Sequence, residues 1–210
     1  VSVSLSPMEE SRRERKKRQT RQLLVGTALR LFAEQGYEQT TVAQIAAAAD
    51  VATKTFFNYF PTKEDVLFAE VMEYMEQMAG VVAEREPSDR VADVLLKTYD
   101  RVIAHYLTKG PVAGDPELAK VYEHLVATVP AIQAKALHMM FGVQREVARH
   151  LLEAFPDVLD PISAASVAGA FVGAVQGAGG AAREAGQSDE EIVASMARAA
   201  EIAIGGLRSF

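Results

Sequence analysis

The stretch TVAQIAAAADVATKTFFNYFPTK, residues 41–63, decides the fold class of this chain. Thr41 and Gln44 have the T-x-x-Q spacing of a capping box, which begins a short helix. After a turn of about three residues a second short helix follows, with Thr53 as its expected cap, and it ends before Pro61 because a residue preceding proline avoids the helical conformation. Two short helices joined this tightly predict a helix-turn-helix, which places its second helix in the major groove of DNA.

The apolar side chains of this stretch predict which face of the two helices is buried. Ile45, Phe56 and Phe60 can close a small core beneath them, with Val51 as a buried pivot in the turn. Asp50 stands in the turn, and Asp tolerates a left-handed backbone better than most residues. The polar side chains are therefore expected on the opposite, exposed face.

Helical periodicity extends over the rest of the chain. Apolar residues recur at three- and four-residue spacing without sustained alternation, which predicts an all-α fold. The helix before the quoted stretch is expected over Thr20–Gln35, with Gly36 as its left-handed stop. Further helices are expected over 62–83, 90–107, 117–128, 131–154, 162–184 and 189–207. We predict a flexible basic arm over 1–19, a helix-turn-helix domain over 20–64 and a larger helical domain over 65–210.

Composition bounds the possible functions. The 210 residues are 49% hydrophobic, which is typical of a globular protein, and they include no cysteine, which excludes disulfides, thiolate zinc sites and cysteine catalysis. The four histidines lack metal-ligand spacing, so we expect no metal and no cofactor. The net charge of −6 conceals an asymmetry, because residues 1–68 carry ten basic and eight acidic residues and the remainder is strongly acidic. Seven of those basic residues fall within 12–21.

Two segments bear on DNA and membranes. The run from Arg12 to Arg18 is interpreted either as a solvated charge run or as an arm near DNA, where each neutralised phosphate would release counterions and raise affinity. Residues 1–10 lack the features of a signal peptide. The 22 uncharged residues 161–182 are long enough to span a bilayer but consist mostly of Ala, Gly and Ser, so we expect no membrane association.

The residues TTVAQIA at 40–46 and VATKTFFNYFPTK at 51–63, with the preceding helix and Gly36, closely resemble the TetR (tetracycline-repressor-like) family. The resemblance covers about residues 20–68, and an all-helical remainder suits the ligand-binding and dimerisation part of such proteins. It implies a cytoplasmic homodimeric transcriptional regulator, usually a repressor, which a small molecule releases from DNA.

Candidate DNA-binding residues follow from the exposed face and from this resemblance. They are Thr41, Gln44, Thr53, Lys54, Thr55, Asn58, Tyr59 and Lys63. Lys54 and Asn58 have the reach and the donors to bind base edges. The resemblance implies phosphate contacts for Tyr59 and Lys63, and Thr41 can offer its amide or hydroxyl to a phosphate. Phe57 stands where the family commonly has tyrosine, and a capping role alone remains the alternative for Thr41 and Thr53.

Small residues recur every fourth position near the C-terminus. Gly169, Gly173 and Gly177, continued by Ala165 and Ala181, form a smooth ridge on one helix, against which another backbone can approach closely. We expect a homodimer interface here, with residues 162–184 and 190–207 of two subunits forming a four-helix bundle. Close packing within one subunit is the alternative.

An effector cavity is expected among the middle helices. Its candidate lining residues are Met72, Met75, Tyr99, Tyr106, Met139 and Met140. Flexible methionines adapt to the shape of a ligand, so we predict a bulky apolar small molecule, although each of these residues also suits an ordinary core.

Two other classes of function are weighed against a DNA-binding regulator. An enzyme is disfavoured because the sequence has no G-x-S-x-G motif and no nucleophile–base pair, so we expect no enzymatic activity. A protein-binding or membrane-surface module that uses the basic arm would bind anionic vesicles without preferring any duplex sequence. The helix-turn-helix motif and the family resemblance imply instead a ligand-responsive repressor that binds a pseudo-palindromic operator in double-stranded DNA as a homodimer.

Overall fold

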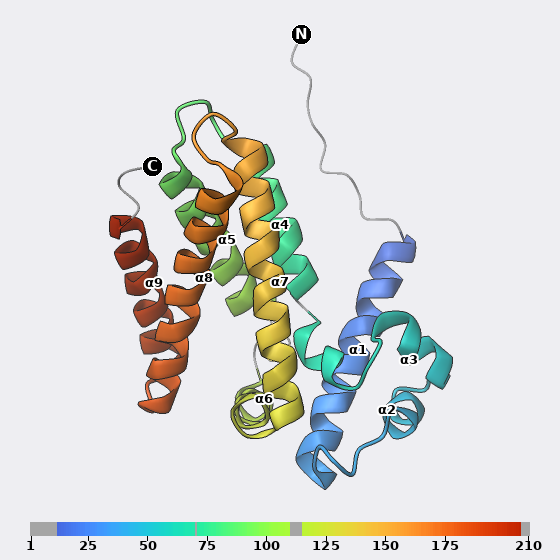
Figure 1. Ribbon diagram of the computed structural model, residues 1–210. Coiled ribbons are helices and arrows are strands. Elements are labelled where there is room, and N and C mark those ends of the chain that lie inside the picture. The colour runs from blue at the N-terminus through green and yellow to red at the C-terminus, as the bar shows by residue number, and fades with distance from the viewer. Residues whose placement is uncertain (1–11, 70, 110–114, 207–210) are drawn as a thin grey trace. The chain divides into compact units, whose positions relative to one another are not determined.

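The computed structural model describes residues 12–69, 71–109 and 115–206, and within those ranges the chain is helical with no strand. The described helices divide into two compact units, one containing α1, α2, α3, η1 and α6 and the other containing α4, α5, α7, α8 and α9 (Figure 1). The all-α prediction is confirmed. The division differs from the expected boundary after residue 64 in two ways, because η1 and α6 both belong with the N-terminal helices.

The N-terminal unit is built on α1, Arg12–Gln35. Short helices α2 (Val42–Ala48) and α3 (Thr53–Tyr59) follow, then a 3-10 helix η1 (Glu64–Phe68), and α6 (Pro116–Thr128) packs against α1. Gly36, with φ of 88°, ends α1 in the predicted left-handed conformation. The side chains of Leu24, Ala28 and Phe32 on α1 are buried and form one wall of the core.

Three expectations for this unit are corrected. α1 begins at Arg12, so residues 12–19 are helical rather than part of a flexible arm, and residues 1–11 lie outside the described residues. The helix expected over 62–83 is two elements, η1 and α4, which belong to different units. α6 was expected in the C-terminal domain, but its contacts with α1 place it here. Those contacts join residues about a hundred positions apart, which local periodicity does not encode.

The second unit is a layered helical bundle. Its helices are α4 (Val71–Ala83), α5 (Val91–Lys109), α7 (Pro130–Ala154), α8 (Pro161–Glu184) and α9 (Asp189–Gly206). α8 packs against both α7 and α9, and α4 packs against α5 and α7 (Figure 1). Buried side chains from all five helices form one core, which includes Met78, Val94, Leu151, Phe171 and Ala200.

Helix α8 is the one described helix whose length and composition would suit a membrane span. One such helix is weak support for a membrane protein, because core helices of soluble proteins meet the same criterion. Here α8 buries Ala164, Val167, Ala168 and Phe171 against its neighbours in the bundle. Asp160 caps its start by accepting hydrogen bonds from the amides of Ile162 (2.8 Å) and Ser163 (2.9 Å).

Candidate nucleic-acid interface

A tight turn sets the angle between α2 and α3. Asp50 has φ of 53°, the left-handed conformation expected for it, and it is the only non-glycine residue in the described chain with a positive φ. The Val51 amide donates to the Ala46 carbonyl at 2.9 Å and the Asp50 amide donates to the Ala47 carbonyl at 3.1 Å. These bonds satisfy the carbonyls of Ala46 and Ala47 at the end of α2, where a helix otherwise leaves its last carbonyls unpaired.

The core beneath α2 and α3 forms largely as predicted. Ile45 and Phe56 are completely buried and Phe60 is 1% exposed, with the Phe56 and Phe60 ring centroids 5.6 Å apart. Val51 is half-buried, so it covers the core rather than forming its buried pivot. Because these apolar side chains are buried, the exposed residues of α3 are mostly polar.

The exposed face of α3 carries polar side chains that can donate hydrogen bonds. Thr53, Lys54 and Asn58 are exposed, and Thr55 and Tyr59 are half-buried. No hydrogen bond or ion pair within the described chain involves the Lys54 ammonium or the side-chain amide of Asn58. Phe57 is 51% exposed and meets the Phe56 ring edge-on, so it packs against the core in part.

Thr41 and Gln44 form the predicted capping box at the start of α2. The Gln44 amide donates to Thr41 Oγ1 at 3.2 Å, and the Thr41 amide donates to Gln44 Oε1 at 2.7 Å. The expectation that Thr53 caps α3 is wrong, because Ala52 occupies the N-cap position and no side chain caps that end. Thr53 is instead the first helical residue, so its hydroxyl is not used by a cap.

Lys63 lies apart from the exposed face of α3. Its ammonium donates to the Tyr37 carbonyl at 2.7 Å and to the Thr40 carbonyl at 3.0 Å, in the connection between α1 and α2. The Tyr37 hydroxyl in turn donates to the Glu64 carboxylate. Burial, together with this bond, raises the pKa of Tyr37. Sequence reasoning missed Tyr37 and Glu64, because nothing in their local pattern marks a contact across 27 positions.

The first two turns of α1 are basic and exposed. Arg12, Arg13, Arg15, Lys16 and Lys17 are exposed along this part of the helix. Positive charges near a helix N-terminus are unfavourable to the helix itself, because they face the positive end of its dipole. A helix that keeps them there carries a positive surface suited to an anionic partner.

Comparison with known proteins shows the family to which the chain belongs. Residues 24–69, which contain the interface described above, match the family model for bacterial regulatory proteins of the tetR family. The HTH-type transcriptional regulator TcmR of Streptomyces glaucescens is 31% identical over 149 residues, which are 70% of this chain and 66% of TcmR. The chain belongs to the TetR family. The matched part spans just under two thirds of TcmR.

Solved TetR-family structures share the fold over most of the chain. A TetR-family transcriptional regulator from Syntrophomonas wolfei has a TM-score of 0.60 at 19% identity, covering 91% of this chain and 97% of that one. FadR from Bacillus subtilis, solved in complex with stearoyl-CoA, has a TM-score of 0.51 at 21% identity, covering 88% and 97%. At these identities the likeness establishes the fold alone.

The glycine ridge of this TetR-family chain is open. Gly169 and Gly173 are half-buried and Gly177 is exposed, and a Cβ atom built at any of the three meets nothing within 4 Å in the described structure. The alternative in which the ridge packs within one subunit is therefore wrong for the described residues. Large apolar side chains are also exposed on α8 and α9. Ile162 on α8 is 80% exposed, and Ile202 on α9 is 66% exposed.

The candidate effector residues are not gathered into one described cavity. Tyr99 is half-buried and donates its hydroxyl to the Val193 carbonyl at 3.2 Å, and Met139 and Met140 are half-buried on α7. The side chains of Met72, Met75 and Tyr106 lie outside the described residues. Where the structure describes the chain, no group of three or more histidines and carboxylates is placed to hold a metal ion.

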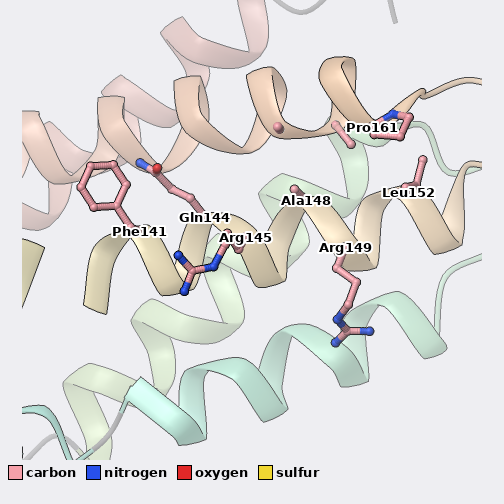
Figure 2. Close-up of a pocket in the computed structure, with 9 residues that line it drawn as sticks. Phe141, Gln144, Arg145, Ala148, Arg149, Leu152 and Pro161 are labelled. Atoms are coloured by element: carbon pink, nitrogen blue, oxygen red, sulfur yellow. The ribbon is translucent and has the colours of Figure 1, made fainter. Parts of the chain in front are cut away.

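A groove of about 630 Å³ runs along α7 and the start of α8. Its described lining residues are Phe141, Gln144, Arg145, Ala148, Arg149, Leu152, Pro161, Ala164 and Ala165 (Figure 2). In Figure 2 Gln144 extends toward α8 and Arg149 points away from it. Arg149 is paired with Glu146 (2.8 Å) and Glu153 (2.9 Å). Tyr99, Met139 and Met140 are absent from this described lining.

Proposed function

We propose that this TetR-family chain is a homodimeric, cytoplasmic transcriptional repressor that binds a pseudo-palindromic DNA operator and is released from it by a bulky apolar small molecule. The observation that carries the proposal is the pairing of a buried α2–α3 core with an exposed polar face on α3. A short helix held in this way can enter a major groove about 12 Å wide.

Base reading is assigned to Lys54 and Asn58. Both side chains are exposed on α3 and have no partner within the described chain, so binding DNA breaks no existing interaction of theirs. A lysine ammonium suits the O6 and N7 acceptors of guanine, and an asparagine amide pairs with N6 and N7 of adenine. Thr53, Thr55 and Tyr59 flank them as candidate phosphate contacts, and Thr41 and Gln44 are candidates at the start of α2.

The homodimer is proposed to form on the α8 ridge. Its small residues are arranged symmetrically in the sequence, with Gly169 and Gly177 four positions on either side of Gly173, and Ala165 and Ala181 eight positions away. A two-fold interface requires a self-complementary surface. If two copies of α8 cross antiparallel at Gly173, each small residue faces another small residue and the backbones can approach closely.

The effector is proposed to enter the second unit, whose core is built largely from aliphatic side chains. FadR, which shares the fold, was solved with stearoyl-CoA, so this fold can accommodate a long apolar chain. Release from DNA requires the effector to bind more tightly to a conformation whose two α3 helices no longer match successive major grooves. Met72, Met75, Tyr99, Tyr106, Met139 and Met140 remain the candidate contacts.

The test is selection of bound duplexes from a random pool, followed by affinity measurements with Lys54→Ala. We expect a pseudo-palindrome to be enriched, and Lys54→Ala to weaken binding by about 1–3 kcal/mol with relaxed specificity at one base of each half-site. Lys120→Ala, a change at an exposed lysine of α6 in the same unit, is the matched control and should leave affinity unchanged. Failure to enrich any sequence at low salt would contradict the proposal.

A vesicle experiment separates this function from a membrane-surface role. Anionic and neutral vesicles are offered to the chain at low and moderate salt. We expect no stable binding to anionic vesicles at a salt concentration where the selected duplex is still bound. Salt-sensitive vesicle binding without any duplex preference would favour the membrane-surface alternative.

A further inference from the structure

The two ends of the α2–α3 segment meet in a cluster of polar contacts. Residues 37–40 lie immediately before α2, and residues 63–64 follow α3. Lys63 Nζ lies 2.7 Å from the Tyr37 carbonyl oxygen, 3.0 Å from the Thr40 carbonyl oxygen and 3.9 Å from the centre of the Tyr37 ring. The Lys63 ammonium thus contacts two backbone carbonyls and an aromatic face. These are more contacts than an exposed lysine usually makes.

The neighbouring residues continue this cluster. The Tyr37 hydroxyl donates to the Glu64 carboxylate, so the residue after Lys63 is held to the same tyrosine. Tyr37 is 6% exposed and Thr40 is 1% exposed. Thr40 Oγ1 donates to the Gly36 carbonyl at 2.8 Å and accepts from Gln35 Nε2 at 3.1 Å, which fixes the connection to the end of α1.

We propose that Tyr37, Lys63 and Glu64 form a clasp that closes the base of the α2–α3 segment and positions α3 for reading DNA, and that Lys63 acts as a positioning residue rather than as a phosphate contact. This inference rests on the proposed function. It changes the role expected for Lys63 from the family resemblance, because the ammonium is directed to carbonyls of its own chain.

Loss of the clasp is expected to weaken binding to a specific DNA site more than binding to unrelated DNA. Base reading needs side chains held in one geometry, whereas non-specific binding needs only positive charge near phosphates. Opening the clasp lets the 41–62 segment populate other orientations, and the affinity for a specific site falls in proportion to the fraction of correctly placed α3. Binding to an unrelated duplex is affected far less.

The test compares Lys63→Met, Tyr37→Phe and Glu64→Met on two probes, the duplex selected by the unaltered chain and a scrambled duplex of equal length, across a series of salt concentrations. We expect each variant to bind the selected duplex about tenfold more weakly, as expected for loss of a charge-assisted hydrogen bond that holds the segment. The scrambled duplex should be bound as before, and the slope of log affinity against log salt should not change.

Glu64→Met gives the sharpest contrast. Removing a negative charge should strengthen binding to both duplexes if only electrostatic attraction matters. The clasp predicts the opposite for the selected duplex. Lys120→Met, which removes a positive charge from an exposed site in the same unit, is the matched charge control and should change neither probe.

Stability is measured for every variant so that unfolding is not mistaken for mispositioning. All affinities are taken well below each melting temperature, where a purely stabilising role would leave the ratio of the two affinities unchanged. Tyr37→Phe keeps the ring that contacts Phe32 and Lys63, so it decides the question if Lys63→Met does not fold.

Two outcomes would overturn the clasp. In the first, Lys63→Met weakens binding to both duplexes and lowers the salt slope by about one while Tyr37→Phe and Glu64→Met behave normally, which would make Lys63 a phosphate contact. In the second, all three variants bind both probes normally. If the unaltered chain selects no duplex, the proposed function itself fails.

Discussion

The exposed faces of α3 and α8 differ in chemistry. On α3 the exposed side chains are mostly polar, apart from Phe57, and Lys54 and Asn58 have no side-chain partners in the described chain. On α8 the exposed ridge has side chains no larger than a methyl group at Gly169, Gly173 and Gly177 and their neighbouring alanines. The first surface offers hydrogen-bond donors to a polar groove, and the second offers close approach to another backbone. The two surfaces therefore suit partners of different chemistry.

The largest expected effect comes from removing the support of α3. Phe56→Ala deletes a completely buried ring and should lower the free energy of unfolding by about 3–5 kcal/mol. Denaturant unfolding followed by circular dichroism measures the change. Phe57→Ala, at the next and half-exposed position, should cost less than about 1 kcal/mol. Equal losses at the two positions would contradict the assignment of the buried and exposed faces.

The corresponding change on α8 is Gly173→Leu. A Cβ atom built at Gly173 meets nothing within 4 Å in the described structure, so the monomer should fold, but the proposed dimer should weaken by about 1–3 kcal/mol through overpacking. Analytical ultracentrifugation across a dilution series gives the dissociation constant. Gly142→Leu, at a similarly open position on α7, is the control and should leave it unchanged. A dimer that tolerates Gly173→Leu fully would move the interface away from the ridge.

A smaller effect distinguishes the starts of α2 and α3. Thr41→Ala removes the capping-box hydroxyl and should lower the free energy of unfolding by about 1 kcal/mol. Thr53→Ala should change it by less than about 0.5 kcal/mol, because its hydroxyl caps nothing. Thermal melting of both variants at neutral pH measures the difference. If Thr53→Ala is the more destabilising change, the cap of α3 has been assigned to the wrong residue.

The smallest expected effect is the pH dependence of the clasp. Burial would raise the pKa of Glu64, but hydrogen bonds from Tyr37, from its own amide and from Thr62, together with the charge of Lys63, lower it below the ordinary value of 4.5. A lowered pKa in the folded state contributes stability that is present above the unfolded pKa and is lost as pH falls through the folded value.

The check compares the unaltered chain with Glu64→Gln between pH 7 and pH 3. The stability advantage of the glutamate should be below about 1 kcal/mol, because the group is partly solvated, and it should disappear on acidification. An advantage that grows toward pH 3 would show that the carboxylate is not held in its charged form.

The prediction from sequence succeeded where the signal is local. The capping box of Thr41 and Gln44, the left-handed Asp50 and the buried Phe56 each depend on residues within a few positions of one another. It failed at Thr53 because propensity for a cap does not decide where the helix begins, and Ala52 takes that place. The roles of the candidate DNA-binding and effector residues remain predictions.

Tertiary structure decided the contacts that join distant parts of the chain. α6 packs on α1 and belongs with the N-terminal helices. The Lys63 ammonium donates hydrogen bonds to backbone carbonyls more than twenty positions away. The sequence by itself determined most of the helices, the turn between α2 and α3 and the inward face of these two helices, because hydrogen bonds and side-chain periodicity within a helix span only three or four residues. Which distant groups each helix meets depends on packing of the whole unit, and no short segment encodes that.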